Sequence, residues 1–398
     1  MYSRNHIKLL SNSNAYIRAI EAALDRAVNE IYLESYIYEN DRTGRQIAES
    51  LRKAALRGVK THLLIDGFGS NRLPQTMIDY LVSSGVRMRK FRPKISPWTL
   101  RRRRLRRLHR KIVVVDLTIA FVGGMNICDD VDTPDQPAPR FDFAVAVEGP
   151  LVQEISMSCR KVWRRVTWIR TPDTVSSNHD RKVPLVKPGG RMGAAFLIRN
   201  NFRHRRDIED AYLQAINQAH NEIIVANAYF LPGRNFRHAL FAAARRGVRV
   251  ILLLQGKGDH WLLQSASKAL YGSFLDAGIE IHEYHKSFLH AKVAVVDEHW
   301  ATVGSSNLDP FSLLLALEAN IVVDDNVFAI ALKHCLDEAI TTGARQVCMD
   351  NWKSQPLILR LTSWISYGLV RIMTGLAGFA PQHDKENPGR QDLPLDHH

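Results

Sequence analysis

Apolar positions along this chain of 398 residues fall in short runs rich in β-branched side chains, each following a more polar stretch. A glycine separates the two in ALRGVKTHLLIDG at 55–67 and in ARRGVRVILLLQG at 244–256. Short apolar runs of this kind are typical of buried strands, and glycine commonly ends the helix before them. The pattern therefore predicts helices that alternate with strands.

The same order of segments occurs twice. NEIYLESYIYEN at 29–40 matches NEIIVANAYFLP at 221–232, and SSGVRMRKF at 83–91 matches DAGIEIHEY at 276–284. Two halves of about 180 residues thus share one β-α-β-α-β order. We expect an α/β fold of two duplicated lobes, each a mixed β-sheet flanked by helices, packed about a pseudo-twofold axis.

Composition predicts where these units begin and end. The N-terminal lobe covers residues 1–169 and the C-terminal lobe covers 199–350. The segment 170–198 is rich in Pro, Gly, Ser and charge, which indicates a linker. Residues 351–381 form an amphipathic helical segment, and the polar tail 382–398 is expected to be disordered.

Two copies of the pattern HxKxxxxD carry the candidate chemistry. Fourteen residues after its histidine, each copy is followed by a turn of small residues that ends in an asparagine, Asn126 or Asn307. The motif residues are His109, Lys111 and Asp116 in the first copy and His290, Lys292 and Asp297 in the second. Because both copies are followed by a similar turn at the same distance, they did not arise by chance.

The spacing of the motif suits a phosphate. Side chains two apart on a strand point to the same side, so His109 lies beside Lys111. The lysine can hold non-bridging oxygens while the imidazole attacks phosphorus or moves a proton. Asp116 and Asp297 lie seven residues after their histidines, an odd spacing that points them to the other side of the strand, and they fall at its end. We therefore interpret them as structural groups of the next turn, with direct catalysis as the alternative.

Two other interpretations of the histidines are a satisfied core residue and a metal ligand. A core histidine explains one copy but not two in matching contexts. An adjacent lysine repels a cation, and neither motif has a third ligand at metal spacing, so no metal is expected. One motif per lobe predicts a shared active site at the interface between the lobes.

On these residues the chain resembles the phospholipase D superfamily, whose mark is two such motifs on a duplicated fold. The resemblance covers about residues 5–345. Within the superfamily, the chain most resembles the bacterial cardiolipin synthases of the shorter B type. The supporting stretches are LLIDGFGS (63–70), HRKIVVVD (109–116), NAYFLPG (227–233), HWATVGSSNLDPFS (299–312) and LEANIVV (317–323).

The resemblance implies a ping-pong phosphatidyl transfer that needs no metal or cofactor. One histidine attacks the phosphodiester and forms a phosphohistidine, while the other protonates the departing alcohol and then deprotonates the incoming one. The family gives the nucleophile role to the N-terminal motif, hence His109, and the acid/base role to His290. The near symmetry of such a site leaves this assignment open.

The resemblance also implies supporting groups. Glu318 and Asp142 would each orient a histidine, although Asp142 could equally be an ordinary acid at a strand edge. The first turn has Gly124 where the second has Ser305, so a hydroxyl ligand exists on one side only. The groups expected to hold phosphoryl oxygens are Lys111, Lys292, Asn126, Asn307 and Ser305.

The charge of the chain indicates an anionic partner. There are 54 Lys and Arg against 40 Asp and Glu, a net charge of +14. The basic run at 96–111 interleaves arginines with Trp98 and leucines, which suits an anionic membrane surface carrying phosphatidylglycerol as substrate. A nucleic-acid surface is the rival interpretation of such runs, but no nucleic-acid partner is expected here.

The C-terminal segment and the start of the chain bear on location. Between Pro356 and Pro381 an apolar, aromatic stretch is interrupted by Arg360 and Arg371, which favours a helix at the membrane interface or one packed on the second lobe. MYSRNHIKLL has no apolar core of a signal peptide, and the four cysteines show no metal or disulfide spacing. We expect a peripheral protein on the cytoplasmic face of a bacterial inner membrane.

Three hypotheses follow for function. The first is a cardiolipin synthase that joins two phosphatidylglycerols and releases glycerol. The second keeps the covalent chemistry but ends in hydrolysis, as a phospholipase D or a nuclease. The third is a basic binding protein on a catalytically dead scaffold, which the intact residues of both motifs argue against. The sequence does not indicate the oligomeric state.

Overall fold

The computed structural model describes residues 1–93, 106–130, 139–167, 190–200, 204–257, 261–310, 316–354 and 356–376. Helices in the first half are α1 (Ser13–Asp25), α2 (Arg42–Leu56), α3 (Gln75–Ser83) and α5 (Leu151–Thr167). Its strands are β1 (Tyr2–Leu10), β2 (Glu30–Ser35), β3 (Lys60–Asp66), β4 (Arg87–Phe91), β5 (Arg107–Leu108), β6 (Lys111–Val115), β7 (Ile119–Gly123) and β8 (Ala144–Glu148).

The second half repeats this order and adds elements at its end. Its helices are α6 (Asp207–Gln218), α7 (Arg234–Arg245), α8 (Trp261–Lys268), α9 (Tyr271–Asp276), α11 (Asn326–Gly343), α12 (Met349–Lys353) and α13 (Leu357–Leu376). Its strands are β9 (Met192–Arg199), β10 (Glu222–Asn227), β11 (Arg249–Gln255), β12 (Glu280–Tyr284), β13 (Lys292–Val296), β14 (Trp300–Gly304), β15 (Ala316–Asp324) and β16 (Ala344–Val347).

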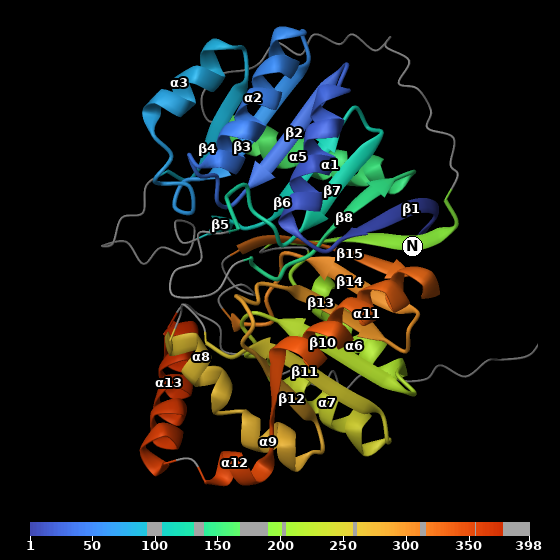
Figure 1. The fold of residues 1–398 in the computed structure, drawn as a ribbon, viewed down its shortest axis with the longest axis vertical. Helices are drawn as coiled ribbons and strands as arrows, with labels where there is room; N and C mark the ends of the chain where they lie inside the picture. The colour runs from blue at the N-terminus through green and yellow to red at the C-terminus, as the bar shows by residue number, and fades with distance from the viewer. Residues whose placement is uncertain are drawn as a thin grey trace, which may run out of the picture.

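Within the described ranges, a 16-stranded sheet runs through both halves (Figure 1). From its centre outward, the first half has the order β1, β8, β7, β6, β2, β3, β4 and the second has the corresponding order β9, β15, β14, β13, β10, β11, β12. In each half the three outer strands of this order run parallel and the others antiparallel. β1 joins β9 at the centre. The predicted α/β fold of two duplicated lobes is confirmed.

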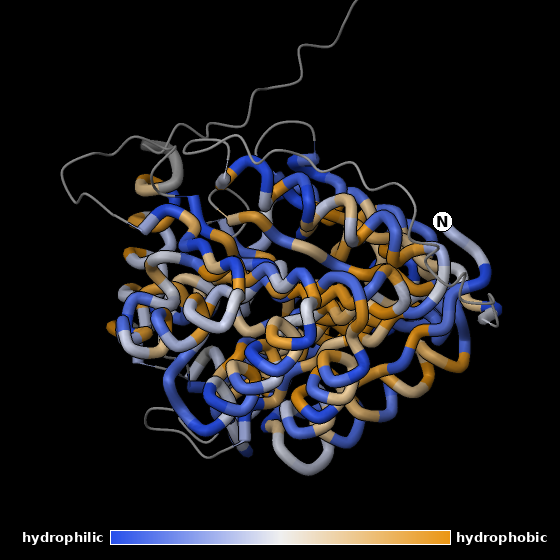
Figure 2. The backbone as a smooth tube through the Cα atoms, turned by 90° about the horizontal axis from the view of Figure 1, so that it is seen from above, coloured by the Kyte–Doolittle hydropathy of each residue, from blue (hydrophilic) through white to orange (hydrophobic). Residues whose placement is uncertain are grey.

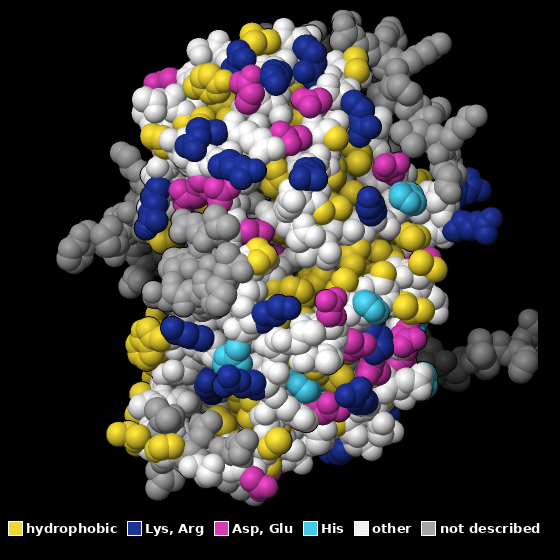
Figure 3. Space-filling model, viewed as in Figure 1, with side chains coloured by type: hydrophobic (Ala, Val, Ile, Leu, Met, Phe, Trp, Pro, Cys, Tyr) yellow, Lys and Arg dark blue, Asp and Glu magenta, His cyan; other side chains and the backbone are white. Residues whose placement is uncertain are grey.

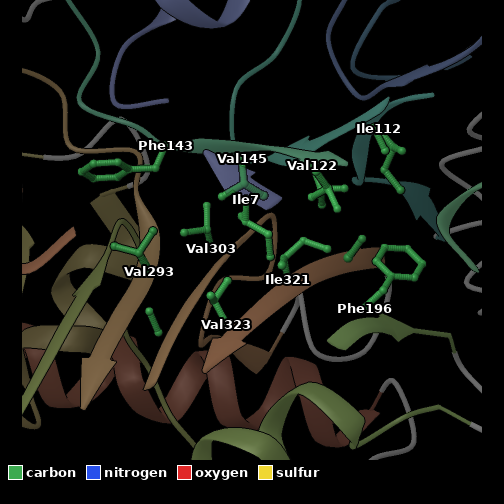
Figure 4. Close-up of a cluster of buried hydrophobic side chains, with 14 of the residues drawn as sticks. Ile7, Ile112, Val122, Phe143, Val145, Phe196, Val293, Val303, Ile321 and Val323 are labelled. Carbon is green, nitrogen blue, oxygen red and sulfur yellow. The ribbon is translucent and has the colours of Figure 1, made fainter. Parts of the chain in front are cut away.

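The main core lies where the two lobes meet. Figure 4 shows Ile7 and Val145 of the first lobe facing Val303 and Ile321 of the second. Helices α5 and α11 complete this shared core, whereas α1 to α3 cover the other face of the first lobe and α6, α7 and α9 that of the second. Hydrophobic positions are accordingly concentrated in the middle of the molecule (Figure 2). Burial of this shared apolar surface holds the lobes together.

Glycines make the repeated transition from helix to strand. Gly58 follows α2 with a φ of 87°, and Gly247 follows α7 with a φ of 89°. The amide of the next residue then bonds back into the helix, as Val59 N does to Ala54 O at 3.1 Å. This left-handed conformation costs a residue with a Cβ about 1–2 kcal/mol, which is why the predicted helix–glycine–strand pattern recurs.

The boundary before the second lobe needs a correction. β9 begins at Met192, so it occupies the end of the segment 170–198 that the sequence assigned to a linker. Pro and Gly just before the strand obscured its alternating pattern MGAAFLIR. Residues 168–189, most of the predicted linker, lie outside the described residues, as does the predicted tail 382–398.

The amphipathic segment expected at 351–381 contains α12 and α13. Among the described helices, none has both the length and the apolar character needed to cross a membrane.

Gly247→Ala should lower the free energy of unfolding by about 1–2 kcal/mol, because a Cβ there meets nothing within 4 Å and only backbone strain is added. Gly368→Ala is the matched control. Gly368 lies inside α13 and also has open space around it, so alanine should leave stability unchanged or raise it by about 0.5–1 kcal/mol. Urea unfolding midpoints measure both, and equal effects would contradict this reading of Gly247.

Candidate active site

Each motif histidine enters the site on a short segment that pairs with the opposite lobe. β5, directly before His109, runs parallel to β15 of the C-terminal lobe, with Leu108 opposite Leu317. His109 N then donates to Leu317 O at 3.0 Å. The backbone of the first motif is therefore held by the strand that carries Glu318 (Figure 1).

The second motif makes the mirrored contact. Leu289 pairs with Phe141 in an isolated bridge, and His290 N donates to Phe141 O at 2.9 Å. Asp142 is the next residue along. At the site, the backbone of each motif thus pairs with a segment of the other lobe. This pairing places each histidine beside a carboxylate of the other lobe.

The side chains follow this crossing. His109 Nδ1 lies 2.9 and 3.0 Å from the two carboxylate oxygens of Glu318, and His290 Nδ1 lies 2.7 Å from Asp142 Oδ2. Both carboxylates are buried, while the histidine side chains stay 16% and 18% exposed. A carboxylate that accepts from Nδ1–H fixes the tautomer in which Nε2 carries a lone pair. Each Nε2 is then available to a reacting group.

Two buried lysines lie among these groups. Lys111 Nζ donates to His109 O at 2.7 Å, and Lys292 Nζ donates to His290 O. Burial lowers the pKa of Lys111 to about 7, and Lys292 lowers it further by repulsion against the opposing pull of Glu318. Two ammonium groups in a desolvated site favour an anion between them.

Electrostatics links the two motifs into one site. Burial lowers the pKa of His109, and Lys111 and Lys292 lower it further while Glu318 raises it. Burial also lowers the pKa of His290 well below its usual value, with further lowering by Lys292, Lys111 and His109. Burial raises the pKa of Asp142 to about 6. These shifts favour the uncharged form of both imidazoles when no anionic ligand is bound.

The predicted asparagines lie next to the motif strands. Asn126 is nearly buried, and its Oδ1 accepts from Ile37 N at 3.1 Å. Asn307 is equally enclosed, and its Oδ1 has no hydrogen-bond partner within the described part of the chain. The first is held by backbone, whereas the second keeps an unsatisfied polar atom.

The hydroxyl of Ser305 has a different partner from the phosphate that we expected. Ser305 Oγ donates to Glu318 Oε2 at 2.5 Å and accepts from Ala319 N at 3.1 Å. It therefore supports the carboxylate behind His109. On the other side a Cβ on Gly124 would lie 2.3 Å from Asp142 Oδ1, so glycine leaves the room that this carboxylate occupies.

A family model described as "Cardiolipin synthase, PLD-like domain" matches residues 20–130 and 212–338, together more than half of the chain. The chain is 37% identical over 395 residues to the "Cardiolipin synthase B" proteins of Shigella flexneri and Escherichia coli strain K12, with 95% of this chain and 91% of each relative covered. "Cardiolipin synthase" of Geobacillus kaustophilus is 33% identical over 315 residues, 78% of this chain and 61% of that protein.

The chain belongs to the phospholipase D-like cardiolipin synthase family. This confirms the resemblance drawn from the two motifs. Among solved structures, a phosphatidylserine synthase of Haemophilus influenzae superposes with a TM-score of 0.64 at 13% identity, covering 92% of this chain and 94% of that one. A polyphosphate kinase of Porphyromonas gingivalis gives 0.56 at 14%, covering 94% and 53%. These two show a shared fold.

The family motif's aspartates lie away from the histidines. Asp116 accepts from the backbone N–H groups of Val28, Asn29 and Glu30 at 2.7–2.8 Å, and Asp297 does the same for residues 220–222. Seven residues of extended chain place each about 23 Å from its histidine. This geometry favours the structural interpretation of both aspartates over direct catalysis.

Two side chains that were not predicted from the sequence hold the segments just before the motif histidines. Asp66 Oδ2 accepts from Leu108 N at 2.8 Å, and Gln255 Oε1 accepts from Leu289 N at 2.5 Å. Each lies at the end of its strand, directly before the glycine of the matched LLIDG and LLLQG segments. The aligned repeat was the available signal, but Asp and Gln at one repeat position concealed their common role as acceptors.

A buried ion pair under the first motif was also missed. Arg110 donates from Nη2 to Glu34 at 2.9 Å, also contacts it through Nε, and donates from Nη1 to Ser158 Oγ at 2.8 Å. The matching positions in the second lobe are Ala291 and Ala226. An ion pair therefore lies beneath the first motif where the second lobe has two alanines.

Within the described ranges, no three His, Cys, Asp or Glu side chains gather as metal ligands would. Most of the basic run at 96–111, from 96 to 105, lies outside the described residues.

Glu318→Gln should lower kcat by roughly 100-fold or more, because it weakens the hydrogen bond that fixes the tautomer of His109. Asp116→Asn should leave kcat close to wild type and lower the free energy of unfolding by about 1–3 kcal/mol, because it disturbs three backbone contacts. Steady-state kinetics and urea unfolding of both variants separate these effects. A larger loss of kcat in Asp116→Asn would contradict this placement.

Lys111 should make stability depend on pH. Its pKa is about 7 in the folded protein against 10.5 for a solvent-exposed lysine, so the unfolded chain binds more protons between these values. The free energy of unfolding should therefore rise with pH across that window. Lys111→Met should show a smaller rise when urea midpoints are compared at pH values near 7 and near 9.5. An equal rise in both proteins would mean that Lys111 is not desolvated.

Proposed function

We propose that this chain is a phosphatidyltransferase that makes cardiolipin from two molecules of phosphatidylglycerol and releases glycerol. One observation carries the proposal. Two imidazoles, each within hydrogen-bond distance of a carboxylate of the other lobe, share a site with two buried lysines. The relatives named cardiolipin synthase B, similar over nearly the whole chain, support cardiolipin as the product.

In the first half-reaction, His109 Nε2 attacks the phosphorus of one phosphatidylglycerol. A bond forms between Nε2 and phosphorus, and the bond from phosphorus to the glycerol oxygen breaks. His290 donates a proton from Nε2 to that oxygen, so glycerol leaves as a neutral alcohol. The product is a phosphatidyl group on His109.

Substrate binding prepares His290 for this step. Lys292 and Lys111 both lower the pKa of His290, and the negative charge of a bound phosphodiester offsets them. The protonated imidazole is then favoured when a proton is needed. Burial lowers the pKa of His109 as well, but the contact with Glu318 opposes this lowering. His109 is then the more basic of the two imidazoles, which supports its assignment as nucleophile.

In the second half-reaction, His290 Nε2 removes a proton from a glycerol hydroxyl of a second phosphatidylglycerol. The hydroxyl oxygen bonds to phosphorus and the bond from phosphorus to His109 breaks, which gives cardiolipin and regenerates both histidines. Lys111, Lys292 and the amides of Asn126 and Asn307 would hold the phosphoryl oxygens, and such charge-assisted contacts stabilise a transition state by several kcal/mol, roughly.

The substrate sets the location of the protein. Phosphatidylglycerol and cardiolipin remain in a bilayer, so the enzyme must work at a membrane surface. A peripheral position on the cytoplasmic face of a bacterial inner membrane suits the net charge of +14.

Purified protein incubated with phosphatidylglycerol in mixed micelles and EDTA should form cardiolipin and glycerol in equal amounts, as measured by lipid mass spectrometry and a glycerol assay. Phosphatidic acid as the main product would mean that water is the acceptor and that the protein is a hydrolase. Cleavage of DNA without any turnover of lipid would replace the proposal with a nuclease.

His109→Ala and His290→Ala should each lower turnover at least about 1,000-fold while the fold is kept. The reason is that both half-reactions need His109 as nucleophile or leaving group and His290 as acid or base. His334→Ala, an exposed histidine on α11, is the control and should not change turnover. Substantial turnover in either motif variant, with native circular dichroism, would contradict a site built from both motifs.

A further inference from the structure

The C-terminal helix α13 has one buried side and one exposed side. Ser363, Ser366 and Val370 are buried on the side that packs against α8, and Val370 belongs to the core of the second lobe. The helix is therefore an integral part of the lobe. Within the described residues, the opposite side of α13 does not pack on the lobe and is exposed.

That opposite side is a stripe of large apolar side chains. Ile358 is 69% exposed, Leu361 61% and Ile365 59%. Spacings of three and four residues along the helix place these side chains in one row. The exposed side chains of α13 in this row are Ile358, Leu361, Ile365, Leu369 and Ile372. Together with the exposed Trp261 of α8, the helix that packs against α13, they are called the docking face below. Figure 3 shows hydrophobic side chains at the lower left, where Figure 1 places α8 and α13.

The residues around the docking face favour an anionic, hydrated boundary over a protein core. The sequence of α13 contains Arg360 and Arg371 and no acid. Trp364 is 56% exposed and meets Tyr367 edge to face at 5.8 Å. Apolar side chains that enter lipid, aromatic rings at headgroup level and arginines toward anionic headgroups are the features of a helix that lies along a bilayer surface.

Hydrogen bonds connect α8, which contributes to the docking face, to the second motif. Gln264 of α8 donates from Nε2 to Gly256 O at 2.5 Å. The neighbouring Gln255 accepts from Leu289 N at 2.5 Å, and Leu289 directly precedes His290. Two hydrogen-bonded steps thus connect the helix that carries Trp261 to the second motif.

We propose that α8 and α13 form a membrane-docking face that holds the active site against an anionic phospholipid bilayer. This inference rests on the proposed function, because it takes the substrate to be a lipid. It adds that the lipid enters the active site from the side of α8 and α13. Association of two copies through this face would bring Arg360 and Arg371 of each close to those of the other, which disfavours that occupant.

The test uses the full chain with Leu361→Glu and Ile365→Glu combined. Cosedimentation with phosphatidylglycerol vesicles should show at least about tenfold weaker binding than wild type, because two acids replace apolar anchors and face anionic lipid. Val327→Glu with Ile330→Glu is the matched control, since these side chains are 74% and 48% exposed on α11. The control should bind vesicles as wild type does.

A second substrate separates this inference from the proposed function. Both double variants should retain wild-type turnover of a short-chain phosphatidylglycerol below its micelle concentration, and the α13 variant should lose turnover on vesicles. Unchanged vesicle binding by the α13 variant overturns the docking face. So does light scattering that shows a wild-type dimer converted to monomers by that variant. If wild type binds vesicles through the face but turns over neither lipid, the proposed function fails and the docking face stands.

Discussion

The crossing of the two lobes at the active site is the constraint on which the rest of the structure depends. Each histidine enters on a segment whose backbone pairs with the other lobe, and its Nδ1 meets a carboxylate from that lobe. A buried carboxylate without a partner costs several kcal/mol, roughly. Docking of the lobes buries Glu318 and Asp142, and the histidine of the other lobe that each one meets offsets part of this desolvation cost. The apolar core between the lobes supplies the docking.

The duplicated fold gives the site two corresponding halves, and a few residue differences between the lobes make these halves unequal. Ser305 supports Glu318 where Gly124 makes room for Asp142, and Arg110 with Glu34 has only alanines as counterparts. Burial lowers the pKa of His290 well below its usual value, whereas Glu318 raises the pKa of His109 against the lowering by burial. The proposed ping-pong reaction gives the two imidazoles unequal roles, since one forms a covalent bond while the other moves protons.

Local pattern predicted much of this arrangement. The helix–glycine–strand repeat and the alternation of His109 with Lys111 are properties of neighbouring residues, and the fold class that they indicated is confirmed. Parity also placed Asp116 at the end of its strand, where its carboxylate holds the start of β2. The partner of Ser305 was not accessible in this way, because a hydroxyl on a turn suits a phosphate or a carboxylate equally.

Which carboxylate meets which histidine could not be read from the sequence, since the answer joins positions 209 residues apart and 148 residues apart. The most direct test is the imidazole Nδ1–H resonance of each motif histidine in ¹⁵N-histidine-labelled protein, assigned with His109→Gln and His290→Gln. Glu318→Gln should shift the resonance of His109 and leave that of His290, and Asp142→Asn should do the reverse. The opposite pattern would contradict the crossed site.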